Sequence, residues 1–251
     1  MKFPIGAAFM FAVAFQSAPA NANNAAYSAY AAGDYAAAVA AATKGGTAED
    51  LALAARALNA VSYFEDGRKS ARRTAGDAYE VAKEAIALDP ALPEAHLQAA
   101  IALALKGARI SPVRAFFSGL ASKARSEIDE ALALDADNPW ALSTSAAWRI
   151  EVARRGGGSL YGADPVEGHR EFLRARALAP DNAAIAYECA LRLAADGRAE
   201  WRADALASLD AAIAATPATR FEADIQALAR DFKAAIAKGE KAERAFIDAQ
   251  P

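Results

Sequence analysis

The sequence AYEVAKEAIALDPALPEAHLQAAIALAL, residues 78–105, decides the fold. Two alanine-rich segments lie on either side of Asp89-Pro90, and alanine is the residue that most favours a helix. Proline just past the end of a helix cannot continue it, and aspartate can cap the helix that follows. The stretch therefore predicts two helices joined by a short turn.

The same junction recurs along the chain. Three further apolar segments end in a comparable way, at Ala131-Leu132-Ala133-Leu134-Asp135-Ala136-Asp137-Asn138, Ala175-Arg176-Ala177-Leu178-Ala179-Pro180-Asp181-Asn182 and Ala212-Ile213-Ala214-Ala215-Thr216-Pro217. Each ends a predicted helix on residues that break or cap helices. The recurrence predicts a chain built from repeated helix pairs.

Small residues mark one face of the helix before each junction. They recur seven positions apart, which is nearly two helical turns, so both members of a pair lie on one face. The pairs are Ala78 and Ala85, Ala124 and Ala131, Gly168 and Ala175, and Ala205 and Ala212, with Ala82, Ile128, Phe172 and Leu209 between them. Such a face allows a neighbouring helix to approach closely.

The helices after the junctions also carry small residues at fixed offsets, such as Ala99-Ala100 and Cys189-Ala190, and Gly33-Asp34-Tyr35 forms an earlier turn. With the Leu-Asp-Pro ending, these features resemble the tetratricopeptide repeat, a helix pair of 34 residues. The resemblance covers residues 23–217. It implies an all-α, right-handed superhelical solenoid of about five helix pairs.

The repeats are longer than the family unit. The small-residue anchors Ala38, Ala78, Ala124, Gly168 and Ala205 are 40, 46, 44 and 37 residues apart. We place the extra residues in three connections, 66–76, 107–118 and 154–167. Residues 218–251 are predicted to form a polar capping helix, from about Ala218 to Ala249, and a tail, because the end of a solenoid needs a polar outer face.

The composition and the N-terminal residues limit the class of protein. The 251 residues are 55% hydrophobic, and alanine dominates that fraction. Residues 1–22 carry one charge, Lys2, then an apolar run and overlapping A-x-A sites that end at Ala20 and Ala22, which is typical of a cleaved signal peptide. We therefore expect a periplasmic or secreted protein without a membrane span, and the net charge of −3 disfavours a nucleic-acid partner.

No arrangement of residues predicts catalysis, a cofactor or a metal. His96 and His169 lie in different repeats without a cysteine at metal-ligand spacing, and both are expected to be structural. Cys189, the only cysteine, occupies a small-residue packing position and is expected to be inert. The glycine-rich run 156–162 lacks the residues of a phosphate-binding loop and is interpreted as a connection. The basic run 68–73 is interpreted as a solvated loop.

In tetratricopeptide-like folds the first helix of each pair lines the concave surface. Transferring that register gives a set of groove candidates: Tyr27, Tyr30, Arg56, Asn59, Leu97, Ile101, Trp140, Glu151, Tyr187 and Leu191. The alternative for each of these side chains is that it packs between repeats and does not line a groove. Phe116, Phe117 and Tyr161 lie in the long connections, where the two phenylalanines form either a small satellite core or a lid. Tyr161 is a candidate contact.

Two functions follow from this reading. The first is an exported, non-catalytic scaffold that holds a protein or peptide in its groove. The second is a periplasmic accessory that binds a small amphipathic solute or lipid, because the enlarged repeats distantly resemble periplasmic tetratricopeptide components associated with TRAP-type transporters. Those components are typically lipoproteins, and no cysteine lies near the cleavage site of this chain.

Overall fold

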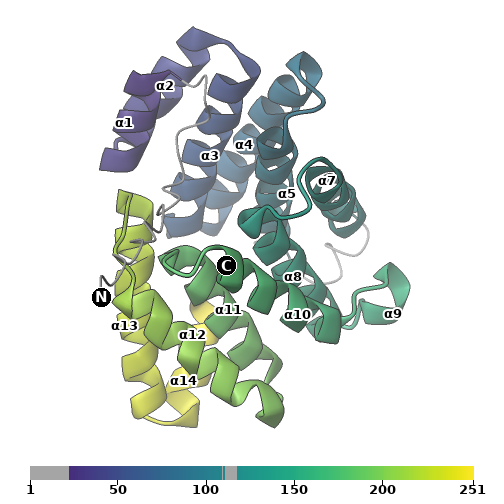
Figure 1. The fold of residues 1–251 in the computed structure, drawn as a ribbon, viewed down its shortest axis with the longest axis vertical. Helices are drawn as coiled ribbons and strands as arrows, with labels where there is room; N and C mark the ends of the chain where they lie inside the picture. Colours follow the sequence, from purple (N-terminus) through teal and green to yellow (C-terminus); the bar gives the residue numbers. More distant parts are fainter. Residues whose placement is uncertain (1–22, 109, 111–117) are drawn as a thin grey trace, which may run out of the picture.

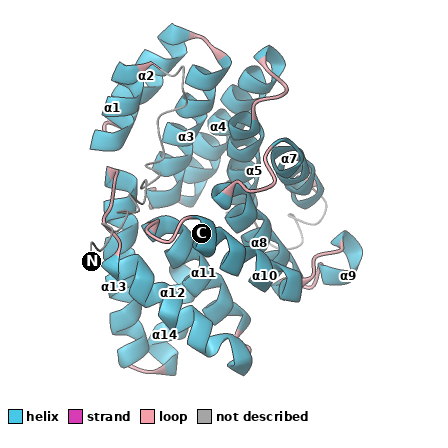
Figure 2. Ribbon diagram, in the orientation of Figure 1, coloured by secondary structure: helices cyan, strands magenta, loops and turns pink. Residues whose placement is uncertain are grey.

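The computed structural model describes residues 23–108, 110 and 118–251, and these residues form an all-helical protein (Figures 1 and 2). The prediction of an all-α fold is confirmed. The α-helices are α1 (Asn24–Ala32), α2 (Tyr35–Gly45), α3 (Ala48–Phe64), α4 (Arg68–Leu88), α5 (Pro93–Ala108), α7 (Leu120–Leu134), α8 (Pro139–Arg154), α9 (Gly158–Tyr161), α10 (Pro165–Leu178), α11 (Ala183–Asp196), α12 (Arg202–Ala214), α13 (Arg220–Ala237) and α14 (Glu240–Ala249). A short 3-10 helix, Ala199–Trp201, precedes α12. None of the helices in the described ranges is long and apolar enough to cross a membrane.

Consecutive long helices pack against each other along the chain. Contacts join α1 with α2, α3 with α4, α5 with α7, α8 with α10, and α11 with α12. Asparagine caps the helix that follows two of the predicted junctions: Asn138 Oδ1 accepts from the Trp140 amide at 3.0 Å, and Asn182 Oδ1 accepts from the Ile185 amide at 2.9 Å. The breakers therefore end and restart helices as their residue types predict.

The small-residue face is buried as predicted. Ala78, Ala124, Gly168 and Ala205 all lie inside the protein. Gly168 shows why the residue must be small, because a Cβ atom there would lie 3.0 Å from the carbonyl oxygen of Ala146 in α8. Backbones of α8 and α10 thus approach closely.

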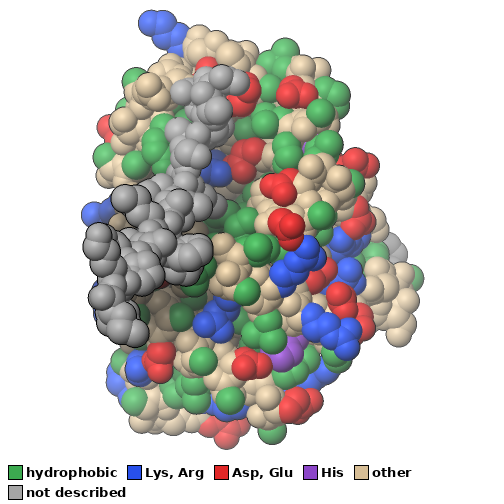
Figure 3. Space-filling model, viewed as in Figure 1, with side chains coloured by type: hydrophobic (Ala, Val, Ile, Leu, Met, Phe, Trp, Pro, Cys, Tyr) green, Lys and Arg blue, Asp and Glu red, His purple; other side chains and the backbone are tan. Residues whose placement is uncertain are grey.

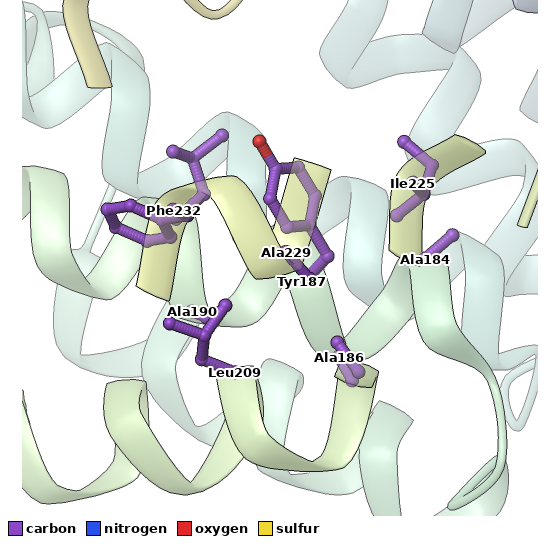
Figure 4. Packing of buried hydrophobic residues seen from close by; sticks show 10 residues of the cluster. Ala184, Ala186, Tyr187, Ala190, Leu209, Ile225, Ala229 and Phe232 are labelled. Carbon is purple, nitrogen blue, oxygen red and sulfur yellow. The ribbon is translucent and has the colours of Figure 1, made fainter. Parts of the chain in front are cut away.

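Three helices near the end of the chain share one core. Tyr187 and Ala190 of α11, Leu209 of α12, and Phe232 of α13 pack together (Figure 4). Because α13 contributes a buried aromatic ring to this core, the last part of the chain is integral to the fold. A polar cap would be less deeply packed.

The C-terminal prediction needs correction. The chain ends in two helices, because Gly239, with φ 105°, interrupts the segment that was predicted to be one polar helix. Helix α13 begins with a capping box in which Thr219 and Glu222 exchange hydrogen bonds, and it buries Ile225, Ala229 and Phe232. It also contacts α1, so helices from the two ends of the described chain meet (Figure 1).

The connections need correction as well. Residues 68–76 are the first turns of α4, and Ala71 and Ala75 are buried there. The basic run 68–73 is therefore helical, because alanines every fourth residue give it an apolar stripe that packs. Connection 154–167 contains the short helix α9. Phe116 and Phe117 lie outside the described residues.

Candidate functional site

A cavity of about 330 Å³, partly open to solvent, lies between the helices. Side chains of α5, α7, α8, α11 and α13 surround it, and most of them are apolar. The larger apolar members are Ile101, Leu103, Leu105, Leu120, Ile128, Trp140, Trp148, Val152, Phe221 and Ile225. Hydrophobic side chains also reach the surface near the centre of the face in Figure 3, among charged side chains. The volume is at the low end of the 300–1,000 Å³ usual for small-molecule sites.

Helix α8 supplies one continuous wall of this cavity. Trp140, Ser143, Thr144, Ala147 and Glu151 line it, and their spacing of three or four residues places them on one helical face. The indole of Trp148 anchors α8 to α7, because its Nε1–H donates to the Ala121 carbonyl at 3.0 Å.

An ion-pair group forms one polar part of the wall. Arg154 donates to both carboxylate oxygens of Glu151, at 2.9 and 3.0 Å, and Arg155 Nε donates to the same carboxylate at 2.5 Å. Burial alone raises the pKa of Glu151, but the hydrogen bond from Arg154 and the charges of Arg192, Arg155 and Arg154 outweigh it and lower the pKa to about 2. Glu151 is therefore a fixed anion at neutral pH.

A second polar group joins α3, α11 and the last residue. The Tyr63 hydroxyl donates to Glu188 Oε1 at 2.9 Å, and Arg192 Nε donates to Glu188 Oε2 at 3.1 Å. Arg192 also donates to the O atom of Pro251 at 2.9 Å. Burial lowers the pKa of Arg192, but the charges of Glu188 and Glu151 more than compensate and raise it. Arg192 is thus held as a cation beside the cavity.

A smaller cavity, of about 70 Å³, adjoins the larger one. Tyr63, Ile101, Leu105, Trp140 and Phe221 line both, so the two cavities share a wall. The remaining lining is largely polar and comprises Tyr27, Tyr30, Arg56, Asn59, Ala60, Gln98, Thr219 and Glu222. Both cavities are mainly apolar, and the smaller one has the larger share of polar lining.

Most of the predicted groove residues line these cavities. Tyr27, Tyr30, Arg56 and Asn59 line the smaller cavity, Glu151 lines the larger, and Ile101 and Trp140 line both. Tyr161, the candidate contact in a long connection, also lines the larger cavity.

Three groove predictions are corrected. Leu97, Tyr187 and Leu191 are at most 1% exposed, pack between helices and line neither cavity. In α11 the larger cavity is lined instead by Ala184, Glu188 and Arg192, and the last two lie one position beyond Tyr187 and Leu191.

Several cavity residues were missed from the sequence. They are Tyr63, Glu188, Arg192, Phe221 and Pro251. A weak signal existed for Glu188 and Arg192, because an acid and a base four residues apart stand out in a helix that is otherwise almost wholly apolar. Nothing local in the sequence distinguishes Phe221.

The histidines and the cysteine lie away from both cavities. His96 bridges α5 to α7, with Nδ1 2.8 Å from Glu127 Oε2 and Nε2 3.0 Å from the Pro90 carbonyl oxygen. The His169 ring packs against Trp201 at a tilt, and its Nε2 lies 2.7 Å from Asp204 Oδ2. Burial raises the pKa of Cys189 to about 11. Among the described residues no three His, Cys, Asp or Glu side chains gather as a metal site would require.

No protein-family model matches this chain, and no curated protein matches it either.

Proposed function

We propose that this protein is a non-catalytic binding protein that encloses a small amphipathic molecule in its paired cavities. A mostly apolar chamber joined to a smaller one with more polar side chains in its lining carries this proposal. Such a shape matches a molecule with an apolar body and a polar end, because small-molecule sites combine apolar walls with a few placed polar groups.

The packing across the centre of the molecule favours a small ligand over a protein segment. Tyr63 of α3 bonds to Glu188 of α11, and Phe221 of α13 packs edge-on against the Tyr63 ring, with centroids 5.9 Å apart. Pro251 lies against Arg192. A helix or extended peptide would have to displace these contacts, whereas a small molecule fits the space between them.

The charged groups favour binding over catalysis. A general acid or base works best when its pKa lies near the working pH. A carboxyl group would need its pKa raised to work in this way near neutral pH, whereas the pKa of Glu151 is lowered to about 2. The carboxylates of Glu151 and Glu188 hold arginines and a tyrosine in place, and these pairs support a positioning role.

The class and location of the protein are part of the same proposal. The five packed helix pairs and the buried small-residue anchors support a tetratricopeptide-like superhelix, whose curvature brings α13 back to α1. Residues 1–22 lie outside the described residues, and their composition supports export by a cleaved signal peptide. A periplasmic or secreted solute-binding or lipid-binding accessory is therefore our candidate, ahead of a protein scaffold.

A dye titration tests the proposal. N-phenyl-1-naphthylamine fluoresces in apolar surroundings, so the protein should give saturable enhancement with one dye per chain. Ile101→Trp adds bulk where the two cavities meet and should weaken dye binding by at least roughly tenfold. Leu88→Trp is the matched control, because Leu88 is exposed and lines neither cavity.

Circular dichroism of both variants checks that they fold. Equal dye binding by wild type and Ile101→Trp would contradict an interior site. The scaffold hypothesis instead predicts no saturable dye binding, together with a protein partner whose binding Ile101→Trp weakens, because Ile101 is one of the predicted groove residues.

A further inference from the structure

A chain of hydrogen bonds fixes the orientation of Asn59 at the smaller cavity. Asn59 Nδ2 donates to the backbone oxygen of Gln98 at 3.0 Å and to Gln98 Oε1 at 2.9 Å. Gln98 Nε2 in turn donates to Glu94 Oε1 at 2.9 Å, and Arg56 Nε donates to that same oxygen at 2.8 Å. Each acceptor in this series of hydrogen bonds already receives one. If the side-chain amide of Asn59 or Gln98 were turned over, two acceptor oxygens would face each other, so both orientations are fixed.

Two residues that line this cavity each hold a buried polar atom without a hydrogen-bond partner among the described residues. Asn59 Oδ1 accepts no hydrogen bond and Trp140 Nε1 donates none within the described part of the chain, and both atoms are buried. Asn59 is only 4% exposed. Both residues line the smaller cavity. Buried polar groups are normally paired, so an unpaired acceptor and an unpaired donor on two residues that line one cavity point to a missing partner, which each atom reaches after a small side-chain shift.

We infer that the smaller cavity binds the neutral polar head of the ligand, a hydroxyl or a primary amide. This inference rests on the proposed function and names the class of ligand. The head donates a hydrogen bond to Asn59 Oδ1 and accepts one from Trp140 Nε1 after small side-chain shifts. The apolar body then passes Ile101, Leu105 and Phe221, which line both cavities, and fills the larger chamber.

Charged heads fit these atoms poorly. A carboxylate has no hydrogen to donate to Asn59 Oδ1, and the cation that could attract it, Arg56, is already paired with Glu94. An ammonium group cannot accept from Trp140 Nε1. After the same side-chain shifts water could pair with both atoms as a hydroxyl does, so the test must separate an alcohol head from water alone.

Isothermal titration with three eight-carbon probes tests the inference. The probes are 1-octanol, its isomer heptyl methyl ether, which accepts but cannot donate, and octanoate at pH 8. We expect 1-octanol to bind about tenfold more tightly than either of the others, which corresponds to about 1.4 kcal/mol. Trp140→Phe keeps an aromatic ring and removes the N–H, and it should weaken 1-octanol about tenfold.

Trp201→Phe is the matched control. It makes the same chemical change at a buried tryptophan that lines neither cavity, and it should leave 1-octanol affinity within twofold. The inference is overturned if octanol and the ether bind equally, if octanoate binds most tightly, or if Trp140→Phe binds octanol like wild type. In each of those cases the proposed interior site survives. If none of the three probes binds, the proposed function falls together with the inference.

Discussion

The Tyr63 hydroxyl donates a 2.9 Å hydrogen bond to Glu188 Oε1, although 125 residues separate the two. The bond joins α3, in the second helix pair, to α11, in the fifth. Phe221 packs edge-on against both Tyr63 and the adjacent Phe64, with ring centroids 5.9 and 5.6 Å apart. The two ends of the helical stack are thereby tied together around the cavities.

Removal of this hydrogen bond should weaken the contact between α3 and α11 and so destabilise the protein. Burial is the main cause that raises the pKa of Tyr63 well above its ordinary value, and the charge of Glu188 adds to it. The Tyr63 hydroxyl therefore stays protonated and donates. We expect Tyr63→Phe to lower the free energy of unfolding by about 1–3 kcal/mol, since the bond has a charged acceptor. Urea denaturation measures this.

Tyr79→Phe is the control for that variant, because no hydrogen bond of the Tyr79 hydroxyl is found within the described residues. It should change stability by less than about 0.5 kcal/mol. If the two variants lose the same stability, the Tyr63 hydrogen bond does not stabilise the contact between α3 and α11.

The ion pairs of Glu151 should make stability depend on pH in acid. The pKa of Glu151 falls from its ordinary value of 4.5 to about 2 in the folded protein, so its stabilisation is present above pH 4.5 and is lost as the pH falls toward 2. Glu151→Gln should cost about 1–3 kcal/mol at pH 7. Denaturation curves at pH 7, 4 and 3 should show the gap between wild type and variant closing, and a gap that widens in acid would contradict this assignment.

The close approach of α8 and α10 should tolerate no side chain at Gly168. A Cβ there would meet the Ala146 carbonyl oxygen at 3.0 Å and the Arg149 Cβ at 3.2 Å, and neither atom can move alone. We expect Gly168→Ala to destabilise the protein by about 1 kcal/mol, because overpacking exceeds the gain in helix propensity. Gly76→Ala should instead stabilise it by about 0.5–1 kcal/mol, because only Lys106 Nζ lies as near as 4.0 Å. Thermal unfolding of both variants should shift in opposite directions.

The Cys189 thiol should be unreactive in the native protein. It is fully buried in α11, Ser208 Oγ lies 3.2 Å from its sulfur, and burial raises its pKa to about 11. Ellman's reagent should therefore label the thiol only after unfolding in guanidinium chloride. Rapid labelling of the folded protein would show that the helix core around Cys189 opens readily.

The sequence predicts the local packing well because that packing depends on spacing. Burial of Ala124 and Gly168 follows from their place seven residues before a second small residue, and the caps at Asn138 and Asn182 follow from residue type. These features need only neighbours within one helix pair.

The cavity wall is less predictable because α11 is covered on more than one side. Its buried residues surround most of the helix, so hydrophobicity alone does not select the face that looks inward. An error of one residue in the helical register rotates the predicted cavity-facing side of α11 by about 100°, so Tyr187 is predicted in place of Glu188. Phe221 was missed for a different reason, since its contact with Tyr63 joins helices that are far apart in the sequence.

We propose that a small amphipathic molecule binds inside the protein. Hydrogen–deuterium exchange with and without 1-octanol locates the binding directly. We predict slower exchange in residues 101–108 of α5, 140–152 of α8 and 184–192 of α11, which contain the cavity walls. Unchanged exchange in these three segments at saturating octanol, or protection confined to α4 and α10, would contradict the account.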